Sequence, residues 1–232
     1  MALSTQVLAT PIFDTFGPLP ETEFGGDGIP NDAVAIGTQL FDGTSITAAL
    51  TAHERFFNPD VENDGAGTFT ALTGTNTGGP GSTSSTVGAL WSFGYFIKVE
   101  GGGRTIQDLQ FDLYYDFDPA SDTAIADLGV IDITAGVLLG GVPISVAEGS
   151  QNLFFSFLGT PAPPVLTPPS GSVPSFDPNA EGEYTFAIVA SDPISGFAVE
   201  IVAIDVQVVP EPTSLALLGL GGLLFTRRRR NR

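Results

Sequence analysis

The sequence predicts an all-β fold, an antiparallel β-sandwich of the jelly-roll or Greek-key type. Apolar residues alternate with polar or small ones at a period of two in many segments, as in strands with one buried face. No segment of ten or more residues shows a helical period, and turn signals such as Asp42-Gly43 and Asp192-Pro193 recur between the alternating segments. Two sheets that each hide one apolar face against the other satisfy this pattern.

Two segments show the alternation most clearly and define the expected centre of the fold. In 90–100 every second residue from Trp91 is apolar, and the positions between them are mostly small or charged. In 109–118 the apolar residues alternate with polar ones, three of which are aspartates. Three glycines, 101–103, lie in the link between these segments, so we expect the two strands to be antiparallel neighbours.

The remaining strands are shorter and are separated by turn residues. They are expected at 33–40, 44–51, 68–73, 129–134, 137–139, 144–146, 152–158, 183–191 and 196–209. The stretches 74–85 and 160–174, one rich in Gly, Thr and Ser and the other in Pro, are expected to be loops. The residues after 174 hold only two good strands and cannot bury a core alone. We therefore expect residues 10–209 to form one β-sandwich domain.

The charge of the chain is strongly negative and unevenly distributed. The chain has 26 acidic and 8 basic residues, and five of the basic residues lie in its last six positions. An acidic body repels phosphate backbones and anionic lipid, which need clustered Lys or Arg. The sequence therefore excludes nucleic acid as a partner and favours attraction for divalent cations. With no cysteine, the chain has neither disulfides nor thiolate metal sites.

The basic residues end a tripartite C-terminal segment, 210–232. A Val-Pro-Glu-Pro sequence precedes an apolar stretch, 215–225, which contains three glycines and is followed by four contiguous arginines. As a helix this stretch would span roughly 15 to 22 Å, short of the ~30 Å hydrocarbon core of a bilayer. We therefore expect a short apolar helix that lodges in a membrane transiently, with its arginines on the cytoplasmic side.

This order of features resembles the PEP-CTERM sorting signal of bacterial exported proteins, which exosortase transpeptidases process. The resemblance implies that the tail is cut near the Pro-Glu-Pro after transient insertion in the inner membrane. It also implies export of the body to the cell envelope or the extracellular polysaccharide matrix of a Gram-negative-type bacterium. The residues that carry the motif are Val209, Pro210, Glu211, Pro212, Arg227, Arg228, Arg229 and Arg230.

Two further observations bear on this resemblance. Body segments such as IPNDAVAI and WSFGYFIKV are similar to phrases in PEP-CTERM proteins of unassigned function. An ordinary amphipathic C-terminal helix is the alternative for the tail, but four adjacent arginines do not lie on one face of a helix.

The N-terminal residues 1–9 fit a secretory signal less well than the tail fits a sorting signal. They contain no Lys or Arg and no long apolar run, although Val7-Leu-Ala9 resembles a cleavage site. One interpretation is that 1–9 are the remnant of a signal peptide. The other is that the protein starts here and stays inside the cell.

The residue types needed for catalysis are scarce. His53 is the single histidine, and the chain has no Gly-x-Ser-x-Gly elbow and no glycine-rich nucleotide-binding motif. Glycoside hydrolysis needs only two carboxylates, and Asp112, Asp116 and Asp118 share a strand face. Alternating carboxylates on an exposed strand face are more simply a solvated surface. We therefore expect that the protein is not an enzyme.

One acidic segment resembles the start of an EF-hand calcium loop. Asp60, Glu62 and Asp64 occupy the first, third and fifth positions, and a glycine occupies the sixth. The twelfth position, however, is Ala71 rather than a bidentate Glu, and no helices are expected beside it. The alternative is a simple Asn-Asp-Gly turn.

A second acidic segment groups Asp116, Asp118 and Asp122 at the end of an expected strand. A loop there could fold the three carboxylates around one calcium ion. The alternative is a solvated acidic loop. Calcium is the one cofactor that the sequence suggests.

An exposed aromatic ring can stack on a saccharide, and Tyr114 is the candidate on the polar face of its strand. Trp91 and Tyr95 share their face with aliphatic residues and are expected in the core. Two classes of function remain. The first is a non-catalytic, sorted structural protein, and the alternative is a carbohydrate-binding or calcium-dependent adhesive module of the cell surface.

Overall fold

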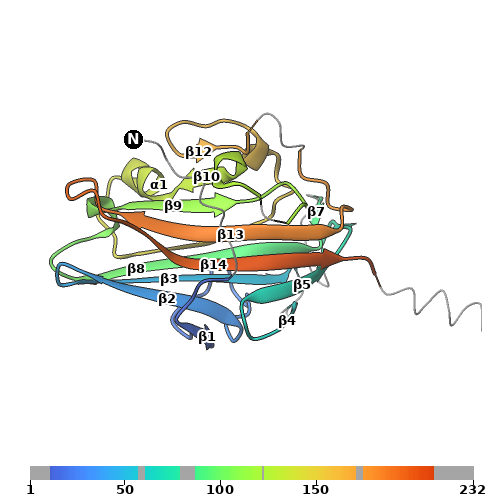
Figure 1. Ribbon diagram of the computed structural model, residues 1–232, viewed down its shortest axis with the longest axis horizontal. Coiled ribbons are helices and arrows are strands. Elements are labelled where there is room, and N and C mark those ends of the chain that lie inside the picture. The colour runs from blue at the N-terminus through green and yellow to red at the C-terminus, as the bar shows by residue number, and fades with distance from the viewer. Residues whose placement is uncertain (1–10, 57–60, 79–86, 122, 171–174, 212–232) are drawn as a thin grey trace, which may run out of the picture.

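A computed structural model describes residues 11–56, 61–78, 87–121, 123–170 and 175–211. The described part is mostly β, in antiparallel and mixed sheets, which confirms the β-rich class that the alternation predicts. Figure 1 shows the long strands in two layers, with the short helix α1 (Ile133–Gly140) beyond β9.

The first layer is a five-stranded antiparallel sheet with the order β1-β2-β3-β8-β11. The turn between β2 and β3 is Asp42-Gly43, and both residues have positive φ, 47° and 73°. Two such residues match the right-handed twist of a hairpin, so this turn fixes the register of the pair. The strands are β1 (Thr15–Gly17), β2 (Val34–Phe41), β3 (Thr44–Glu54), β8 (Trp91–Gly101) and β11 (Val146–Gln151).

The second layer is a seven-stranded sheet in which β14 and β5 run parallel while the other pairs are antiparallel. In spatial order its strands are β12 (Leu166–Thr167), β10 (Gly129–Asp132), β9 (Gln110–Tyr115), β13 (Gly182–Ser191), β14 (Ala198–Val209), β5 (Thr68–Leu72) and β4 (Glu62–Asn63). A small ribbon is formed by β6 (Thr75–Asn76) and β7 (Gly88–Ala89).

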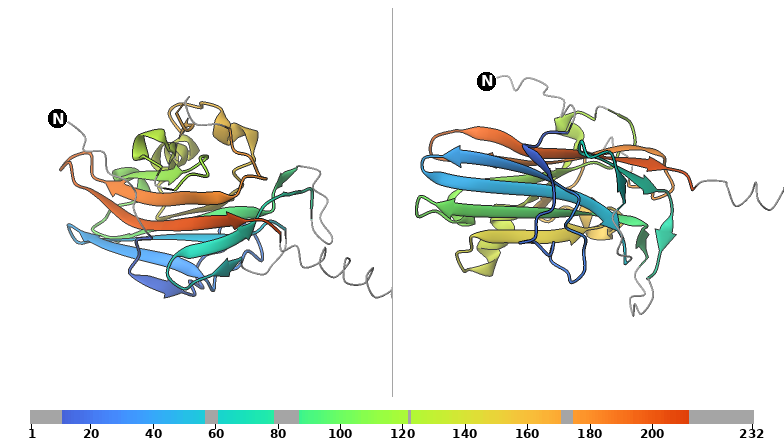
Figure 2. Two further views of the ribbon diagram at one scale, coloured as in Figure 1. Left: turned by 45° about the vertical axis from the view of Figure 1, so that its right-hand side comes forward. Right: turned by 90° about the horizontal axis from the view of Figure 1, so that it is seen from below.

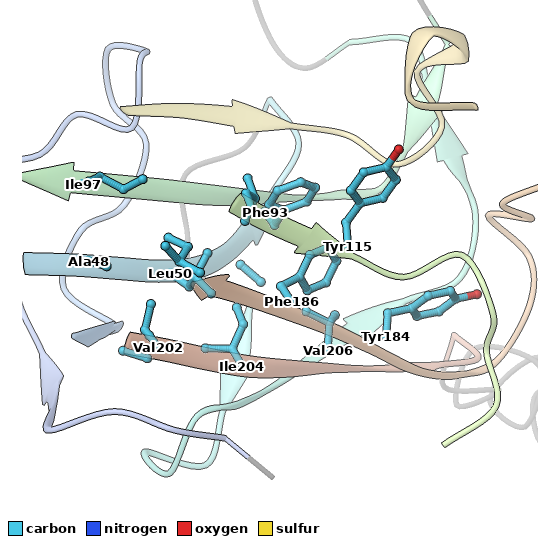
Figure 3. Packing of buried hydrophobic residues seen from close by; sticks show 14 of the residues in the cluster. Ala48, Leu50, Phe93, Ile97, Tyr115, Tyr184, Phe186, Val202, Ile204 and Val206 are labelled. Carbon is cyan, nitrogen blue, oxygen red and sulfur yellow. The ribbon is translucent and has the colours of Figure 1, made fainter. Parts of the chain in front are cut away.

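The inward faces of the two sheets share one apolar core, part of which Figure 3 shows. Every second residue of β8, from Trp91 to Val99, lies in this core or packs against it, as the alternation predicts. The rings of Phe93 and Phe186, from opposite sheets, have centroids 4.4 Å apart. Burying one large apolar side chain contributes about 1.5–3 kcal/mol, so this face holds the two layers together.

The N-terminal part of the described chain joins one edge of the first sheet to the second sheet. Ile12 exchanges two backbone hydrogen bonds with Ala203 of β14, at 3.0 and 2.8 Å. A few residues later, β1 pairs with β2 of the other sheet. The right-hand view of Figure 2 shows this segment, in dark blue, running across the longer strands. These bonds satisfy backbone groups that would otherwise be left at sheet edges.

The prediction that segments 90–100 and 109–118 are neighbours is wrong, because β8 and β9 belong to different sheets. The link between them carries a short 3-10 helix, η1 (Ile106–Asp108), whose Ile106 is fully buried. Because Ile106 and Leu109 both enter the shared core, the chain crosses from one layer to the other instead of turning back in the same layer.

Two further expected strands are helical. The segment 137–139 lies in α1, where Asp132 caps the helix by accepting a hydrogen bond from the Ala135 amide at 2.7 Å. Gly141 ends the helix in the left-handed conformation. The segment 152–158 contains the 3-10 helix η3 (Ser156–Gly159) instead of a strand. Strand β11 ends at Gln151, and the buried side chain of Asn152 then forms hydrogen bonds with the backbone amide and carbonyl of Ala89 in β7.

Other boundaries differ by a few residues. The strand expected at 144–146 begins at Val146 and runs to Gln151, at one edge of the first sheet. The loop expected at 160–174 contains the two residues of β12. Within the described ranges, no helix combines the length and the apolar character that crossing a membrane requires. Residues 1–9, Asp60, Asp122 and the apolar helix expected in the tail lie outside the described residues.

Candidate functional site

The C-terminal end of β14 is where the folded body meets the tripartite segment. Val208 is 2% exposed and pairs with Ala71 of β5, and Val209 pairs with Leu72. The Val209 carbonyl accepts a hydrogen bond from the Thr73 amide at 3.0 Å. The next residue, Pro210, is exposed and has no N–H to continue the ladder. The folded ladder therefore ends one residue before the Pro-Glu-Pro.

A hollow of about 400 Å³ lies beside this exit and is lined by Val209 itself. Its walls are apolar, formed mainly by Val61, Ala71, Leu72, Leu90 and Trp91. Its polar lining comes from Glu54, Glu62, Thr70 and Asn76. Sequence reasoning missed this hollow because its walls come from four separate parts of the chain, which only the strand pairing brings together.

The single histidine, His53, has a serine partner. Its Nε2 lies 2.8 Å from Ser150 Oγ, and its Nδ1 lies 3.1 Å from the Glu54 carbonyl oxygen. Burial lowers the pKa of His53 below 6.5, and the Glu54 carbonyl only partly offsets this, so the ring is neutral at pH 7. Because a carbonyl only accepts, Nδ1 carries the proton and Nε2 accepts from Ser150.

This arrangement resembles a base and a hydroxyl nucleophile, but its surroundings are those of a packed polar contact. His53 is 6% exposed, and neither the hollow beside Val209 nor the cleft near Tyr95 described below is lined by His53 or Ser150. Ser150 is 97 residues away from His53 in sequence, on a strand separated from β3 by β8, so no sequence pattern predicts the pair.

In the first calcium candidate, the Asp64 side chain is held in a turn by backbone hydrogen bonds. The Asp64 carboxylate accepts hydrogen bonds from the amides of Ala66 and Thr68 at 2.7 and 3.0 Å. Gly65 has φ of 71°, which suits the tight turn. Glu62 lies in β4 and is exposed, and Asp60 is outside the described residues.

The second candidate contains a buried carboxyl, which corrects the expectation of a solvated strand face. Asp116 is 1% exposed because β9 ends at Tyr115 and the chain then turns inward. It accepts a hydrogen bond from the Asp118 amide at 2.8 Å, and Asp118 accepts one from Ala120 at 3.0 Å. Burial raises the pKa of Asp116 to about 6.

A buried tyrosine lies in the same region. The Tyr184 hydroxyl has no hydrogen-bond partner among the described residues, and Figure 3 shows it pointing toward the chain that leaves β9. Burial, with the charges of Asp116, Asp177 and Asp118, raises the pKa of Tyr184 to about 12. In the described ranges no three acidic or histidine side chains are grouped as metal ligands, and Asp122 lies outside those ranges.

The saccharide candidate, Tyr114, lies on the outer face of β9 but is half-buried. It packs against a small buried cluster of Leu128, Ala187 and Ala203, which Ile125 also contacts. Burial raises the pKa of Tyr114, and the charges of Asp112 and Glu200 add to this. Trp91 is in the core, as expected.

Tyr95 packs against the core and also lines an open cleft of about 450 Å³ near α1. The cleft lies between β11 and the start of the helix, and its other walls are mostly aliphatic, including Ile131, Ile144 and Val165. Asp132, which also lines it, already caps α1.

Comparison with known proteins identifies the tripartite segment. Residues 208–230 match the family model described as the PEP-CTERM protein-sorting motif, which confirms the resemblance seen in the sequence. No curated protein and no solved structure matches the chain. The matched region starts at Val208, so the first two residues of the motif belong to β14 and the rest follow the folded ladder.

Proposed function

We propose that this chain is the precursor of a non-catalytic structural protein that is sorted through its C-terminal motif to the cell envelope or the extracellular polysaccharide matrix. The observation that carries the proposal is the position of the motif at 208–230, where it overlaps β14 by only two residues. Such a motif is consistent with export and with processing by exosortase, a membrane enzyme.

The geometry of the exit supports processing without damage to the body. Among the described residues the buried core ends at Val208, and Pro210 and Glu211 are exposed. The sequence places prolines at positions 210 and 212, and prolines favour an extended backbone, a form that a peptidase can grip. A cut at this place leaves every described strand intact.

The charge of the body supports a location outside the inner membrane after processing. The chain carries a net charge of −18 even with the arginine tail, and removing the tail makes the body more acidic. An acidic surface stays soluble and is repelled by anionic lipid. Extracellular polysaccharide of a Gram-negative-type bacterium is the environment that we propose for the mature protein, and inner-membrane insertion is a transient step before it.

The C-terminal mass of the protein isolated from its own host tests this proposal. We expect a mature C-terminus between Pro210 and Pro212, with the arginine tail removed. An intact Arg232 on a protein recovered from the cytosol contradicts both the sorting and the location.

The absence of catalysis needs its own test because of the His53–Ser150 pair. We expect no labelling of Ser150 when the full chain is treated with a fluorophosphonate probe, because His53 is buried and neither residue lines the hollow beside Val209 or the cleft near Tyr95. The matched control is a serine hydrolase labelled under the same conditions. Labelling of Ser150 that disappears in His53→Ala would overturn the non-catalytic assignment.

A second candidate function is a calcium-dependent adhesive module carried by the same sorting route. The observation that favours it is the unpartnered Tyr184 hydroxyl in the region of Asp116 and Asp118. Calcium that binds only the folded state raises the melting temperature. We expect a rise with calcium and none with magnesium if this candidate is right, and an unchanged melting temperature rejects it.

The carbohydrate-binding form of this candidate rests on Tyr114, whose ring is partly covered. A shift in melting temperature with host polysaccharide that is lost in Tyr114→Ala would support it. For the fold, we propose the finer class of a jelly-roll or Greek-key sandwich, and we propose that residues 10–209 are a single domain.

A further inference from the structure

The surface around the end of β14 combines the apolar hollow with an acidic rim formed by Glu54 and Glu62. A short connection joins this surface to the apolar segment of the tail. We propose that this surface docks on the membrane transpeptidase that processes the motif, with a basic and apolar segment of the enzyme seated in the hollow. This inference rests on the proposed sorting function. It states that the enzyme contacts the folded body in addition to recognising the tail.

The length of the connection makes contact with the enzyme unavoidable. Val209 is the last residue held in the ladder, and the apolar stretch of the tail begins at Leu215, six residues later. An extended chain spans at most about 3.3–3.6 Å per residue, so the connection reaches roughly 20 Å. When the stretch lies in a bilayer, an enzyme that cuts at 210–212 must fit into this gap and must touch the adjoining end of the body.

The side chains of the hollow indicate which kind of enzyme segment can bind there. Leu72, Leu90 and Trp91 provide an apolar lining, and Glu54 and Glu62 add two carboxylates. Neither carboxylate forms an ion pair with any described residue. The nearby Arg55 is 6% exposed, and its side chain binds the carbonyl of Asn76 at 3.0 Å.

A partner with basic and apolar side chains complements this surface, whereas an anionic lipid surface is repelled by it. The proposal therefore names the enzyme rather than the bilayer as the occupant.

Strand register holds the acidic rim at a fixed spacing from the exit. Glu62 pairs with Thr70 of β5, and Val209 pairs with Leu72, two positions further along the same strand. Because β5 pairs with the strands of both residues, a partner seated between Glu62 and Val209 lies beside the point where the Pro-Glu-Pro segment begins. This alignment suits an enzyme that must place a short substrate segment accurately.

The experiment compares processing rates of full-length variants in a strain that contains the cognate exosortase. The test variant is Glu54→Gln with Glu62→Gln, and the measurement is the ratio of precursor to mature mass in a pulse-chase. The matched control is Asp42→Asn with Glu100→Gln, which removes the same charge. Figure 1 shows the turn after β2 at the end of the molecule opposite the exit of β14, and Glu100 pairs with Ser45 near that turn.

We expect the test variant to be processed about three- to tenfold more slowly and the control to match the wild type, because removing rim charges reduces association rates. Thermal melting verifies that each variant is folded. If the double variant does not fold, Glu62→Lys replaces it, since Glu62 is exposed and makes no ion pair with the described residues.

Equal rates for the test variant and the wild type overturn the docking proposal while leaving the sorting function intact. A wild-type chain that is never processed contradicts the sorting function itself. Faster processing of the test variant, accompanied by binding to anionic vesicles, overturns the docking proposal in favour of direct contact with lipid.

Discussion

Gly37 of β2 lies so close to Ile201 of β14 that a Cβ at position 37 would overlap the Ile201 carbonyl oxygen. Strands β2 and β14 belong to different sheets and come close together here, near the bridge between Ile12 and Ala203. Only glycine permits this approach, because the obstacle is backbone and cannot rotate away.

We expect Gly37→Ala to lower the free energy of unfolding by about 2–3 kcal/mol, because overpacking a rigid contact forces backbone movement. Chemical denaturation measures the change. Gly140→Ala is the matched control, since a Cβ there meets open space and φ is not in the left-handed range. Equal stability of the two variants would show that β2 and β14 are further apart than described.

The ladder at Val209 predicts where the chain can be shortened. A chain ending at Glu211 keeps the Thr73–Val209 hydrogen bond and the buried Val208, so its unfolding free energy should match the full chain within about 0.5 kcal/mol. A chain ending at Gln207 loses both, and we expect a loss of about 2–4 kcal/mol. Parallel denaturation of the two truncated chains measures the difference. If both truncations have the same effect, β14 does not hold its last two residues.

The buried carboxyl of Asp116 predicts stability that depends on pH. Its pKa in the folded protein, about 6, lies above the ordinary 3.8, so folding favours the protonated form. The contribution of the protonated Asp116 carboxyl to the free energy of unfolding is fully present below pH 3.8. It is lost as the pH rises through 6, a change on the order of 3 kcal/mol.

Asp116→Asn should remove this part of the pH dependence and should be more stable than the wild type at pH 7. Asp118→Asn is the comparison variant, and it should keep most of the pH dependence because burial is the main cause of the raised Asp116 pKa and the charge of Asp118 adds less. Melting curves between pH 4 and pH 7 provide the measurement. A wild-type slope in Asp116→Asn across this interval would show that another group titrates there.

Asn152 predicts a large loss of stability from one small change. Its side-chain amide donates to the carbonyls of Trp91 and Ala89 at 2.6 and 3.1 Å and accepts from the Ala89 amide at 2.9 Å. Asn152→Ala leaves these buried backbone groups without a partner, and we expect a loss of about 3 kcal/mol or more.

The control for this prediction is Asn179→Ala, because the Asn179 hydrogen bonds are exposed. Denaturation of the two variants under the same conditions compares them. A small effect of Asn152→Ala would mean that water replaces the amide.

The sequence alone determined which residues of β8 and β9 face the core. The alternation in β8 and β9 is local, because successive side chains of a strand point to opposite faces wherever that strand lies. It also determined the sorting motif, since the Pro-Glu-Pro sequence, an apolar stretch and contiguous arginines are read along the chain without reference to the fold. The family match at 208–230 confirms this part.

Only the tertiary structure decided which strands are neighbours. The alternation of β8 and β9 is the same whether they pair or face each other across the core, and the burial of Ile106 places them in different sheets. Likewise, 137–139 is helical because Asp132 and Gly141 cap a helix that its own short apolar pattern does not specify. Propensity and periodicity describe one segment at a time, whereas capping and packing depend on partners elsewhere.

The candidate sites divide in the same way. The exit at Pro210 was visible in the sequence, but the hollow beside it was not, because Glu54, Glu62 and Trp91 meet only through the pairing of separate strands. The sequence pattern predicts a solvated Asp116, because the alternation of period two continues in the sequence beyond Tyr115. The strand itself ends at Tyr115, and Asp116 is buried. The sequence determined the order of the chemical groups along the chain, and long-range packing decided which of them lie together and which are removed from water.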